Sequence, residues 1–509
     1  MSDPHPFSPT SSRTASPIGQ RAVVMGASIA GLLAARILAG RFAEVLLLER
    51  DDLPDGAVAR KGTPHAVHPH GLLSKGRHVM EALLPGLFAE LDGLGAVLGT
   101  RADEVLMMAG GRRLAAGPQP LAGVAVSRLA LEAGIRRRVL ALPGVRALTG
   151  VDVNEPVFDA GLQRVTGVRI TRRDSGSQEV IAADLVVDCT GRGSHTPTWL
   201  TTWGYDAPEE ERVDVGIRYS SAYFPRDART DGLPLAVICQ ATADLPRPAV
   251  MIAQEPDADG QPRWVVGTGG YAGDHPEPTI DGIRRRAQEV GCAEIVRVTH
   301  ELEPIGEVLR YNYSHSQRRR FERLARFPGR YLVMGDAITS FNPIYGQGMT
   351  TAACEALALA AALRDGLDGA HRRFFPAAAQ VIDTPWQLAV GSDLAIPSVQ
   401  GRRSAQVRVV NGYLRWLYAA AEVDPHVTYA FSRVVHLLAP PASIMAPRIL
   451  LRVLGHRLRR ALTAGTHARA VDAHARTRGA AAPATPARSP AAPVAPASSS
   501  PSRPAPRGA

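Results

Sequence analysis

Three small residues near the start of the chain have the spacing Gly-x-Ser-x-x-Gly. Gly26 follows the apolar segment 21–25, and Ser28 and Gly31 open a second apolar stretch. This pattern predicts a strand, a tight turn and a helix whose free N–H groups face a pyrophosphate, although a plain strand-turn-helix is the alternative. Glu49 ends the next apolar segment, about 20 residues on, where a carboxylate holds the ribose hydroxyls of a dinucleotide. Ser28 stands at the middle position of the motif, where a dinucleotide-binding turn usually has a glycine, and its hydroxyl is able to bond the phosphate.

Two later segments have features of the same kind of site. Segment 183–194 is an apolar strand that ends in a glycine-rich turn, and segment 329–355 joins a strand to the pair Gly335-Asp336, a loop and an apolar helix. That helix, 349–363, carries a single charged residue, so we expect it to be buried on nearly all sides. The three segments together predict a nucleotide-binding domain assembled from discontinuous parts.

The order of the elements predicts an α/β protein. Short β-like runs alternate with turns across 213–298, which indicates an inserted antiparallel sheet, and the cleft between this sheet and the nucleotide domain is where we expect a ligand. The ends are rich in Ser, Pro, Ala or Arg and are predicted to be disordered. The predicted parts are a lead-in (1–20), a Rossmann-like domain (21–75, 100–205 and 325–370), a substrate domain (206–324), a helical region (371–462) and a tail (463–509).

The composition excludes several classes of protein. The net charge of +10 comes mainly from the residues after His456, where nine arginines against one aspartate give +8. The remainder of the chain carries +2 and shows no basic stripe that would bind nucleic acid.

The four scattered cysteines predict free thiols in a reducing cytoplasm. No apolar run predicts a transmembrane segment. Segment 434–454 is interpreted either as a peripheral membrane contact or substrate entrance, or as a helix pair packed on the body.

The motifs as a set resemble the FAD-dependent monooxygenases of the aromatic-hydroxylase-like superfamily, over most of residues 20–363. The resemblance implies FAD as cofactor, with Asp336 on its ribityl chain and Arg128 near its pyrophosphate; a solvated surface arginine is the alternative for Arg128. It also implies that the loop before helix 349–363 brings N–H groups to the pyrimidine edge of the isoalloxazine, where a helix N-terminus stabilises the charge of a reduced flavin. Spacing and resemblance together assign cofactor binding to Gly26, Ser28, Gly31, Glu49, Arg50, Arg128, Asp336, Pro343, Gly346, Gly348 and Met349.

A closer likeness joins segments 60–70 and 341–349 to the bacterial flavin epoxidases of polyether polyketide pathways and their relatives. His65 stands where those proteins carry glutamine. His65, His68 and His70 share one proline-flanked loop without acidic or thiolate partners, so we predict no metal site and interpret them as flavin-facing or structural residues. Segment 188–191 reads Asp-Cys-Thr-Gly, whereas the corresponding motif of the family usually ends in Asp-Gly. The motif therefore does not decide whether a nicotinamide cofactor docks directly. We expect NADPH or NADH as the reductant, either directly or through a flavin reductase partner.

The resemblance implies insertion of one oxygen atom from O2 into a hydrophobic, unsaturated small molecule through a flavin hydroperoxide. Epoxidation and hydroxylation both stay open, and secondary metabolism such as polyketide biosynthesis is the expected context. The cofactor carries the chemistry while the protein positions the substrate and excludes water. The alternatives are a flavin-dependent reductase or dehydrogenase acting on prenyl or polyene chains, a halogenase, for which only Lys61 and Lys75 are present, and a non-enzymatic scaffold.

Overall fold

The computed structural model describes residues 17–99, 101–121 and 123–462. The predicted tail 463–509 and residues 1–16 of the predicted lead-in lie outside the described residues, and the first strand already begins at Gly19. Two units divide the chain, one ending at His456 and one beginning at Arg457. In the second unit the described residues, 457–462, are helical. Within the described part of the chain, no helix has the length and apolar character needed to span a membrane.

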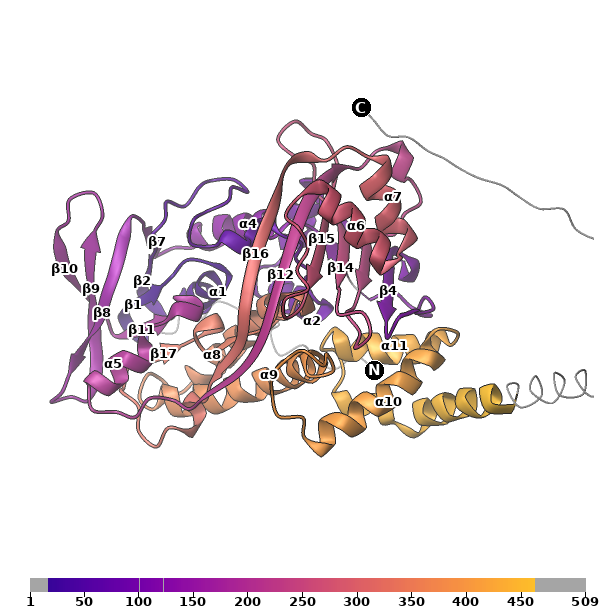
Figure 1. The fold of residues 1–509 in the computed structure, drawn as a ribbon. Helices are drawn as coiled ribbons and strands as arrows, with labels where there is room; N and C mark the ends of the chain where they lie inside the picture. The colour runs from indigo at the N-terminus through magenta and orange to yellow at the C-terminus, as the bar shows by residue number, and fades with distance from the viewer. Residues whose placement is uncertain (1–16, 100, 122, 463–509) are drawn as a thin grey trace, which may run out of the picture. The chain divides into compact units, whose positions relative to one another are not determined.

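A five-stranded parallel sheet forms one half of the first unit, with strand order β17-β11-β1-β2-β7. The last four residues of β1, β2 and β11 are buried and almost all apolar, as expected for a parallel sheet covered on both faces. Helix α1 packs against β1, β2 and β11, and the sheet β10-β9-β8 lies beside β11 (Figure 1). The strands are β1 (Gly19–Met25), β2 (Phe42–Leu48), β7 (Val145–Leu148), β8 (Val151–Asp159), β9 (Arg164–Arg172), β10 (Gln178–Ala182), β11 (Leu185–Asp188) and β17 (Tyr331–Val333).

An eight-stranded sheet forms the other half, with order β18-β16-β12-β15-β14-β13-β4-β5. It is antiparallel except where β13 pairs with β4, and two of its strands, β12 and β16, are long and carry bulges (Figure 1). A separate pair joins β3 (Val97–Gly99) to β6 (Gly123–Ala125). The sheet strands are β4 (Val105–Ala109), β5 (Arg112–Arg113), β12 (Glu210–Pro225), β13 (Ala236–Cys239), β14 (Ala249–Gln254), β15 (Arg263–Gly270), β16 (Ile305–Arg319) and β18 (Thr339–Ser340).

The sheet therefore draws on more of the chain than the segment predicted for it. Strands β4 and β5 come from before 206–324, and β18 comes from after it. Alternation of apolar residues indicates that a strand is half-buried, but it does not indicate which sheet the strand joins. The predicted boundaries of the nucleotide and substrate domains stay a prediction.

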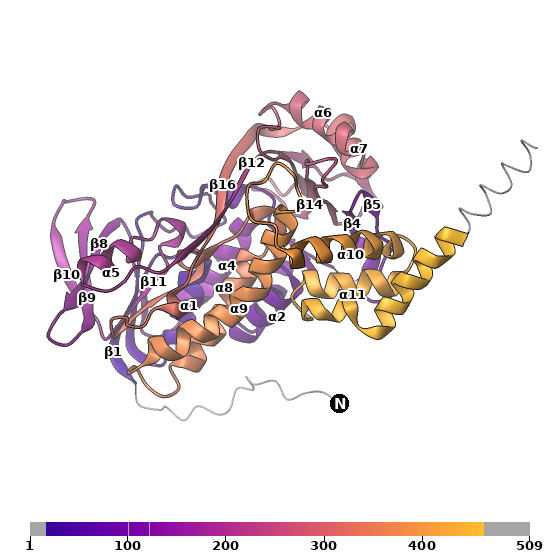
Figure 2. The same ribbon diagram turned by 60° about the horizontal axis from the view of Figure 1, so that its bottom comes forward.

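Helix α8 lies at the centre of the helical layers, in contact with α1, α2 and α9. Most of its residues are buried, which confirms the expectation from its single charged residue. Figure 2 shows α9, α10 and α11 grouped on one side of it. The helices are α1 (Ile29–Leu38), α2 (Ser74–Leu83), α3 (Leu87–Gly93), α4 (Arg128–Leu140), α5 (Thr196–Thr202), α6 (Ile280–Val290), α7 (Ala293–Glu301), α8 (Gly348–Ala362), α9 (Ala370–Asp393), α10 (Ala405–Ala421) and α11 (Pro425–Val435).

The segment 434–454 packs on this helical group. Val434, Ile444 and Ile449 are buried in one apolar cluster with Leu417 of α10. Burial of apolar area of this kind stabilises a helix pair on the body of the protein. The packing favours the interpretation of segment 434–454 as a helix pair packed on the body over that of a membrane contact or substrate entrance.

Gly31 leaves no room for a side chain in α1. A Cβ atom there would collide with the carbonyl oxygen of Gly26, which is backbone and cannot move aside. We therefore expect Gly31→Ala to lower the free energy of unfolding by about 2 kcal/mol, as overpacking does. Gly412→Ala is the matched control, because a Cβ on that α10 glycine meets open space. It should be neutral or slightly stabilising. Equal stability of Gly31→Ala and the parent in urea unfolding would contradict the packing described.

Candidate cofactor site

The three predicted strand ends meet at one edge of the parallel sheet. Met25 of β1 is paired with Asp188 of β11, and Asp188 is paired with Val333 of β17. The turns that follow these strands are in close contact. A Cβ at Gly26, whose φ is +97°, would lie 2.6 Å from the carbonyl oxygen of Cys189. A Cβ at Gly335, whose φ is +69°, would lie 2.7 Å from the Cβ of Ala30. The sequence prediction that three distant segments converge is confirmed.

The first turn is held by the carboxylate of Glu49. Its Oε2 accepts a hydrogen bond of 3.0 Å from the N–H of Ala27, and its Oε1 accepts bonds from the N–H groups of Arg50 and Asp51. The carboxylate thereby lies at the carboxyl end of β2, beside the turn that precedes α1. Arg50 itself is exposed.

A buried ionic network joins the start of α1 to α4. The Arg128 guanidinium donates to Ser28 Oγ at 2.8 Å, and Ser28 Oγ donates to Glu132 at 2.8 Å. Arg60 pairs with Glu132 at 2.5 Å and with Glu49 at 3.3 Å. Burial raises the pKa of the Glu132 carboxyl, but Arg128 and Arg60 outweigh it and leave the pKa below its usual value. The network therefore stays ionised and places Arg128 beside the Gly-x-Ser-x-x-Gly turn.

Sequence reasoning did not assign Glu132 or Arg60 a place in the site. The only local signal was the spacing of Arg128 and Glu132, four residues apart on one helix, which puts both side chains on one face. The partnership with Arg60, far away in the sequence, depends on the fold.

Asp336 lies in the turn after β17, close enough to this network for the charge of Arg128 to act on it. The residue is accessible to solvent, yet desolvation by the surrounding protein raises its pKa, while the charges of Arg128 and Arg192 act in the opposite direction. Glu355 of α8 supports its turn by accepting a 2.6 Å bond from the N–H of Gly335. Burial raises the pKa of Glu355 to about 8.

Three arginine nitrogens in this part of the structure have no hydrogen-bond partner among the described residues. They are Arg60 Nη1, Arg128 Nε and Arg192 Nη2, and all three atoms are buried. Arg60 Nη1 still has an ion-pair partner in Glu49. The Arg192 guanidinium also stacks on the ring of Tyr313, 4.7 Å from its centre. Unpaired buried cationic donors are costly unless an anion meets them, so this donor set fits a pyrophosphate.

The loop that ends at α8 brings the start of that helix to the same cleft. Gly346 has φ +63°, and a Cβ there would lie 3.0 Å from the carbonyl oxygen of Gly71. A Cβ at Gly348 would lie 3.9 Å from Asp336 Oδ1. Pro343 opens the short 3-10 turn before Gly346, and Met349 lies in the first turn of α8. The first N–H groups of the helix therefore lie at the end of the cleft marked by Asp336.

A buried carboxylate fixes this loop from behind. Oδ1 of Asp393, at the end of α9, accepts hydrogen bonds from Asn342 Nδ2 at 2.8 Å, Tyr345 Oη at 2.8 Å and Tyr271 Oη at 3.0 Å. Its Oδ2 has no partner among the described residues. Burial raises the pKa of Asp393 to about 7, although the three donors lower it. We refer to Asn342, Tyr345, Tyr271 and Asp393 as the loop anchor.

The histidine segment bridges Arg128 and the eight-stranded sheet. Arg128 forms a short hydrogen bond to His65 Nε2. His68 Nδ1 bonds Ser221 of β12 at 2.9 Å, and its ring lies edge-on to Tyr219. Burial lowers the pKa of His68 to about 4 and that of His70 to about 3, so both rings are neutral at pH 7. The three histidine rings lie next to the rings of Tyr219 and Tyr311, and we refer to these five rings as the aromatic wall.

Asp188 organises the turn that follows β11, the second of the three strand ends. Its two carboxylate oxygens accept bonds from the hydroxyls of Thr190, Ser194 and Thr196, each at 2.5 to 2.6 Å. The side chain is fully buried. Its role is therefore to shape the turn 189–193, which carries Arg192 toward Asp336.

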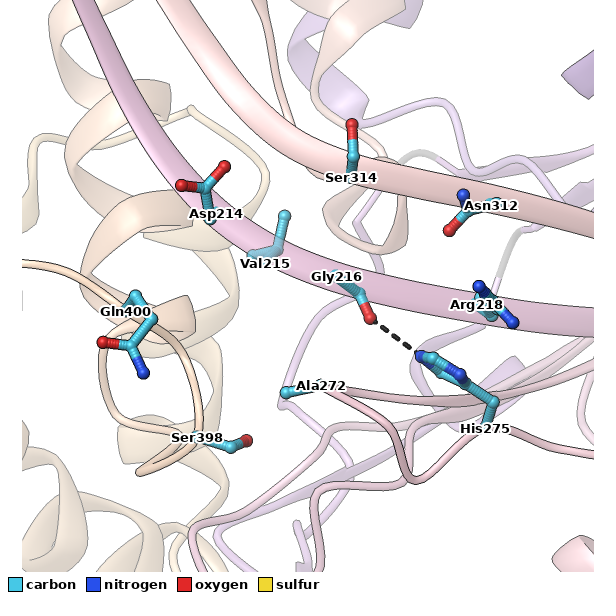
Figure 3. Close-up of a pocket in the computed structure, with 10 residues that line it drawn as sticks. All are labelled: Asp214, Val215, Gly216, Arg218, Ala272, His275, Asn312, Ser314, Ser398 and Gln400. Carbon is cyan, nitrogen blue, oxygen red and sulfur yellow. Dashed lines mark hydrogen bonds between the residues drawn. The ribbon is translucent and has the colours of Figure 1, made fainter.

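A separate polar pocket of about 570 Å³ opens along β12 and β16, with Ser398 and Gln400 on another wall. Figure 3 shows the His275 ring reaching the carbonyl of Gly216, with a 3.1 Å contact at Nε2. None of its lining residues was predicted to hold the cofactor, and the pocket is not part of the site described above.

Comparisons of sequence give two relatives, while no protein-family model matches the chain. Protein Rv3254 of Mycobacterium tuberculosis (strain ATCC 25618 / H37Rv) is 34% identical over 453 residues, which cover 86% of this chain and 94% of the relative. Kynurenine 3-monooxygenase of Salinispora arenicola (strain CNS-205) is 28% identical over 358 residues, which cover 65% of this chain and 70% of that enzyme.

Solved structures with the same fold include p-nitrophenol 4-monooxygenase PnpA from Pseudomonas putida DLL-E4. Its TM-score is 0.57 at 18% identity, covering 82% of this chain and 98% of that one. The structure of pqsL, a probable FAD-dependent monooxygenase from Pseudomonas aeruginosa, has a TM-score of 0.51 at 19% identity, covering 74% and 97%. The chain thus has the fold of the FAD-dependent monooxygenases, which confirms the predicted α/β architecture and its helical C-terminal region. Within that fold it belongs to the same family as Protein Rv3254.

The loop anchor gives the protein a pH-dependent stability. A carboxyl whose folded pKa is raised to about 7 binds more protons in the folded state than in the unfolded state, so its contribution is present at low pH and is lost as pH rises toward 7. We expect Asp393→Asn to reduce the decline in unfolding free energy between pH 5 and 7.5 by ~2 kcal/mol.

Urea unfolding at the two pH values measures this. Asp365→Asn is the control, because Asp365 is exposed just beyond α8. A decline that is as steep in Asp393→Asn as in the parent and the control would show that Asp393 does not carry the effect.

Proposed function

We propose that the protein is an FAD-dependent monooxygenase that inserts one oxygen atom from O2 into a hydrophobic, unsaturated small molecule. The observation that carries the proposal is the convergence of the three strand ends, which brings Ser28, Arg128 and Asp336 together. Arg128 donates a hydrogen bond to Ser28, and its charge acts on the Asp336 carboxyl. The arrangement therefore offers a cationic donor at the helix-opening turn and a carboxylate beside the N-terminus of α8.

Four parts of an FAD molecule have a candidate partner in this arrangement. Glu49 would hold the ribose hydroxyls, Ser28 and Arg128 the pyrophosphate, and Asp336 the ribityl hydroxyls. The N–H groups after Gly346 would meet the pyrimidine edge of the ring. When bound, FAD supplies electron transfer and the activation of O2.

The protein's own residues orient the cofactor and close the site. His65 accepts a bond from Arg128, so a neutral imidazole holds the guanidinium in place; burial and then the Arg128 charge lower the pKa of His65 well below its usual value. The N-terminus of α8 stabilises negative charge that develops on the ring. The loop anchor fixes the direction of those N–H groups, because Tyr345 and Asn342 are both held by Asp393.

The aromatic wall supports a flat, conjugated substrate. Tyr219 of β12 and Tyr311 of β16 form a group of neighbouring rings with the neutral His68, where the eight-stranded sheet meets the histidine segment. Both named monooxygenases among the relatives and structures, for kynurenine and p-nitrophenol, carry the names of aromatic compounds. Hydroxylation of an aromatic ring and epoxidation of a conjugated alkene both fit, and the likeness of segments 60–70 and 341–349 to polyether-pathway epoxidases supports the second.

The halogenase alternative has little support in the structure. Such enzymes need a lysine that reaches the oxidant, but Lys61 is exposed and Lys75 lines a cavity that includes no predicted cofactor residue. A flavin-dependent reductase or dehydrogenase acting on prenyl or polyene chains remains the second candidate, because it would use the same cofactor cleft. NADPH or NADH would reduce the flavin in either case, directly or through a flavin reductase.

Turnover under isotopically labelled O2 tests the proposal. The purified protein with FAD, NADPH and a set of aromatic and conjugated alkene substrates should give a product that contains one labelled oxygen atom. Omitting O2 should abolish the product. Reduction of a polyene without O2 would establish the reductase alternative, and the absence of label from every product would contradict the monooxygenase proposal.

A further inference from the structure

A second cavity, of about 560 Å³, lies along the flank of α8 away from the residues predicted to hold the cofactor. Its volume falls in the range of small-molecule sites. Helices α2, α8 and α9 and the segment after α11 contribute its walls. The lining residues are mostly apolar: Leu357, Ala358, Ala377, Val381, Pro385 and the segment 437–440, with Lys75, Thr351, Cys354 and Thr384 as the polar members.

The cavity contains one cation without a counter-ion. The Lys75 ammonium makes no ion pair or hydrogen bond with any other described side chain. Cys354, which also lines the cavity, supplies no negative charge at pH 7, since burial raises the pKa of its thiol to about 11 even though Lys75 acts to lower it. A lone half-buried ammonium among apolar side chains favours an anion, which pairs strongly where water is scarce.

The wall formed by segment 437–440 is held in an unusual backbone conformation. Leu437 has φ +57°, at a position after a helix where glycine is normal, and the N–H groups of Leu438 and Ala439 both bond the carbonyl of Arg433. A leucine there costs conformational energy that glycine would not. This residue lines the cavity.

His436 attaches this wall to α2. Its Nδ1 accepts a 3.1 Å bond from the N–H of Ser74, and its carbonyl accepts a bond from the N–H of Lys75. The imidazole is neutral at pH 7, because burial lowers its pKa to about 4. The position of Lys75 and that of the Leu437 wall are therefore fixed relative to each other.

Helix α9 adds a polar group within the apolar lining. Pro385 lies within this continuous helix and has no N–H, so the carbonyl of Val381, four residues earlier, lacks its helical donor. Both residues line the cavity, as does Thr384.

We propose that this cavity binds a small amphiphile with one carboxylate and a linear apolar chain, the carboxylate pairing with Lys75 and the chain lying along α8 between Leu357 and the Leu437 wall. The site is distinct from the cofactor cleft, and the proposal does not depend on the flavin chemistry. Sodium laurate, kept below its micelle concentration, is the probe for this ligand class.

The two lysines of the chain allow a direct test on the full-length protein. Acetylation by a limiting amount of an amine-reactive reagent, read by peptide mass spectrometry, reports each lysine separately. Laurate should slow labelling of Lys75 by about tenfold and leave the exposed Lys61 unchanged. The uncharged 1-dodecanol should protect Lys75 much less. Equal protection of both lysines, or of neither, overturns the proposal.

Calorimetric titration of variants provides the second readout. Lys75→Gln should weaken laurate binding by about tenfold, Lys75→Arg should retain it, and Lys61→Gln should match the parent. Ala377→Phe, which fills the cavity from α9, should abolish binding while the charge of Lys75 is kept. Thermal unfolding verifies that each variant folds. Unchanged affinity in Lys75→Gln, or laurate binding that survives Ala377→Phe, contradicts the site.

Discussion

Close packing of three backbone turns at the carboxyl edge of the parallel sheet is the constraint on which the site depends. The turn after β1 contacts the turn after β11, and the turn after β17 contacts the start of α1, each at a glycine with positive φ. No side chain larger than hydrogen fits at these contacts. Because the turns are so close, the residues that follow them, Ser28, Arg192 and Asp336, are brought to one cleft.

Several charged side chains are buried together at this site. Arg60, Glu132 and Arg128 are buried together, and burying charges is favourable only when they are paired or hydrogen-bonded. Arg128 Nε and Arg192 Nη2 have no hydrogen-bond partner in the described part of the chain, and the charges of both arginines act on the accessible carboxylate of Asp336. The arrangement is that of a binding site whose anionic ligand completes the hydrogen bonding.

Local patterns in the sequence predicted the parts of the fold that local physics decides. The apolar run before Gly26 predicts a buried strand, Gly31 predicts close helix packing, and the single charge of α8 predicts its burial; the structure has all three. Local patterns did not predict which other elements these helices and strands contact. Asp393 reaches Asn342 across about fifty residues of sequence, and β4 joins β13 in parallel within an otherwise antiparallel sheet. Periodicity identifies which face of an element is buried, but the tertiary fold selects what it meets.

The cofactor roles of the predicted residues stay predictions, and FAD affinity tests them most directly. Titration of the protein with FAD, followed by the quenching of flavin fluorescence, should give saturable binding at one site. Arg128→Gln should weaken that binding by at least about tenfold, because it removes a cationic donor from the pyrophosphate position. Arg137→Gln, on the exposed side of the same helix, should have no effect. No FAD binding by the parent, or equal affinity in parent and Arg128→Gln, would contradict the proposal that the three strand ends hold one flavin.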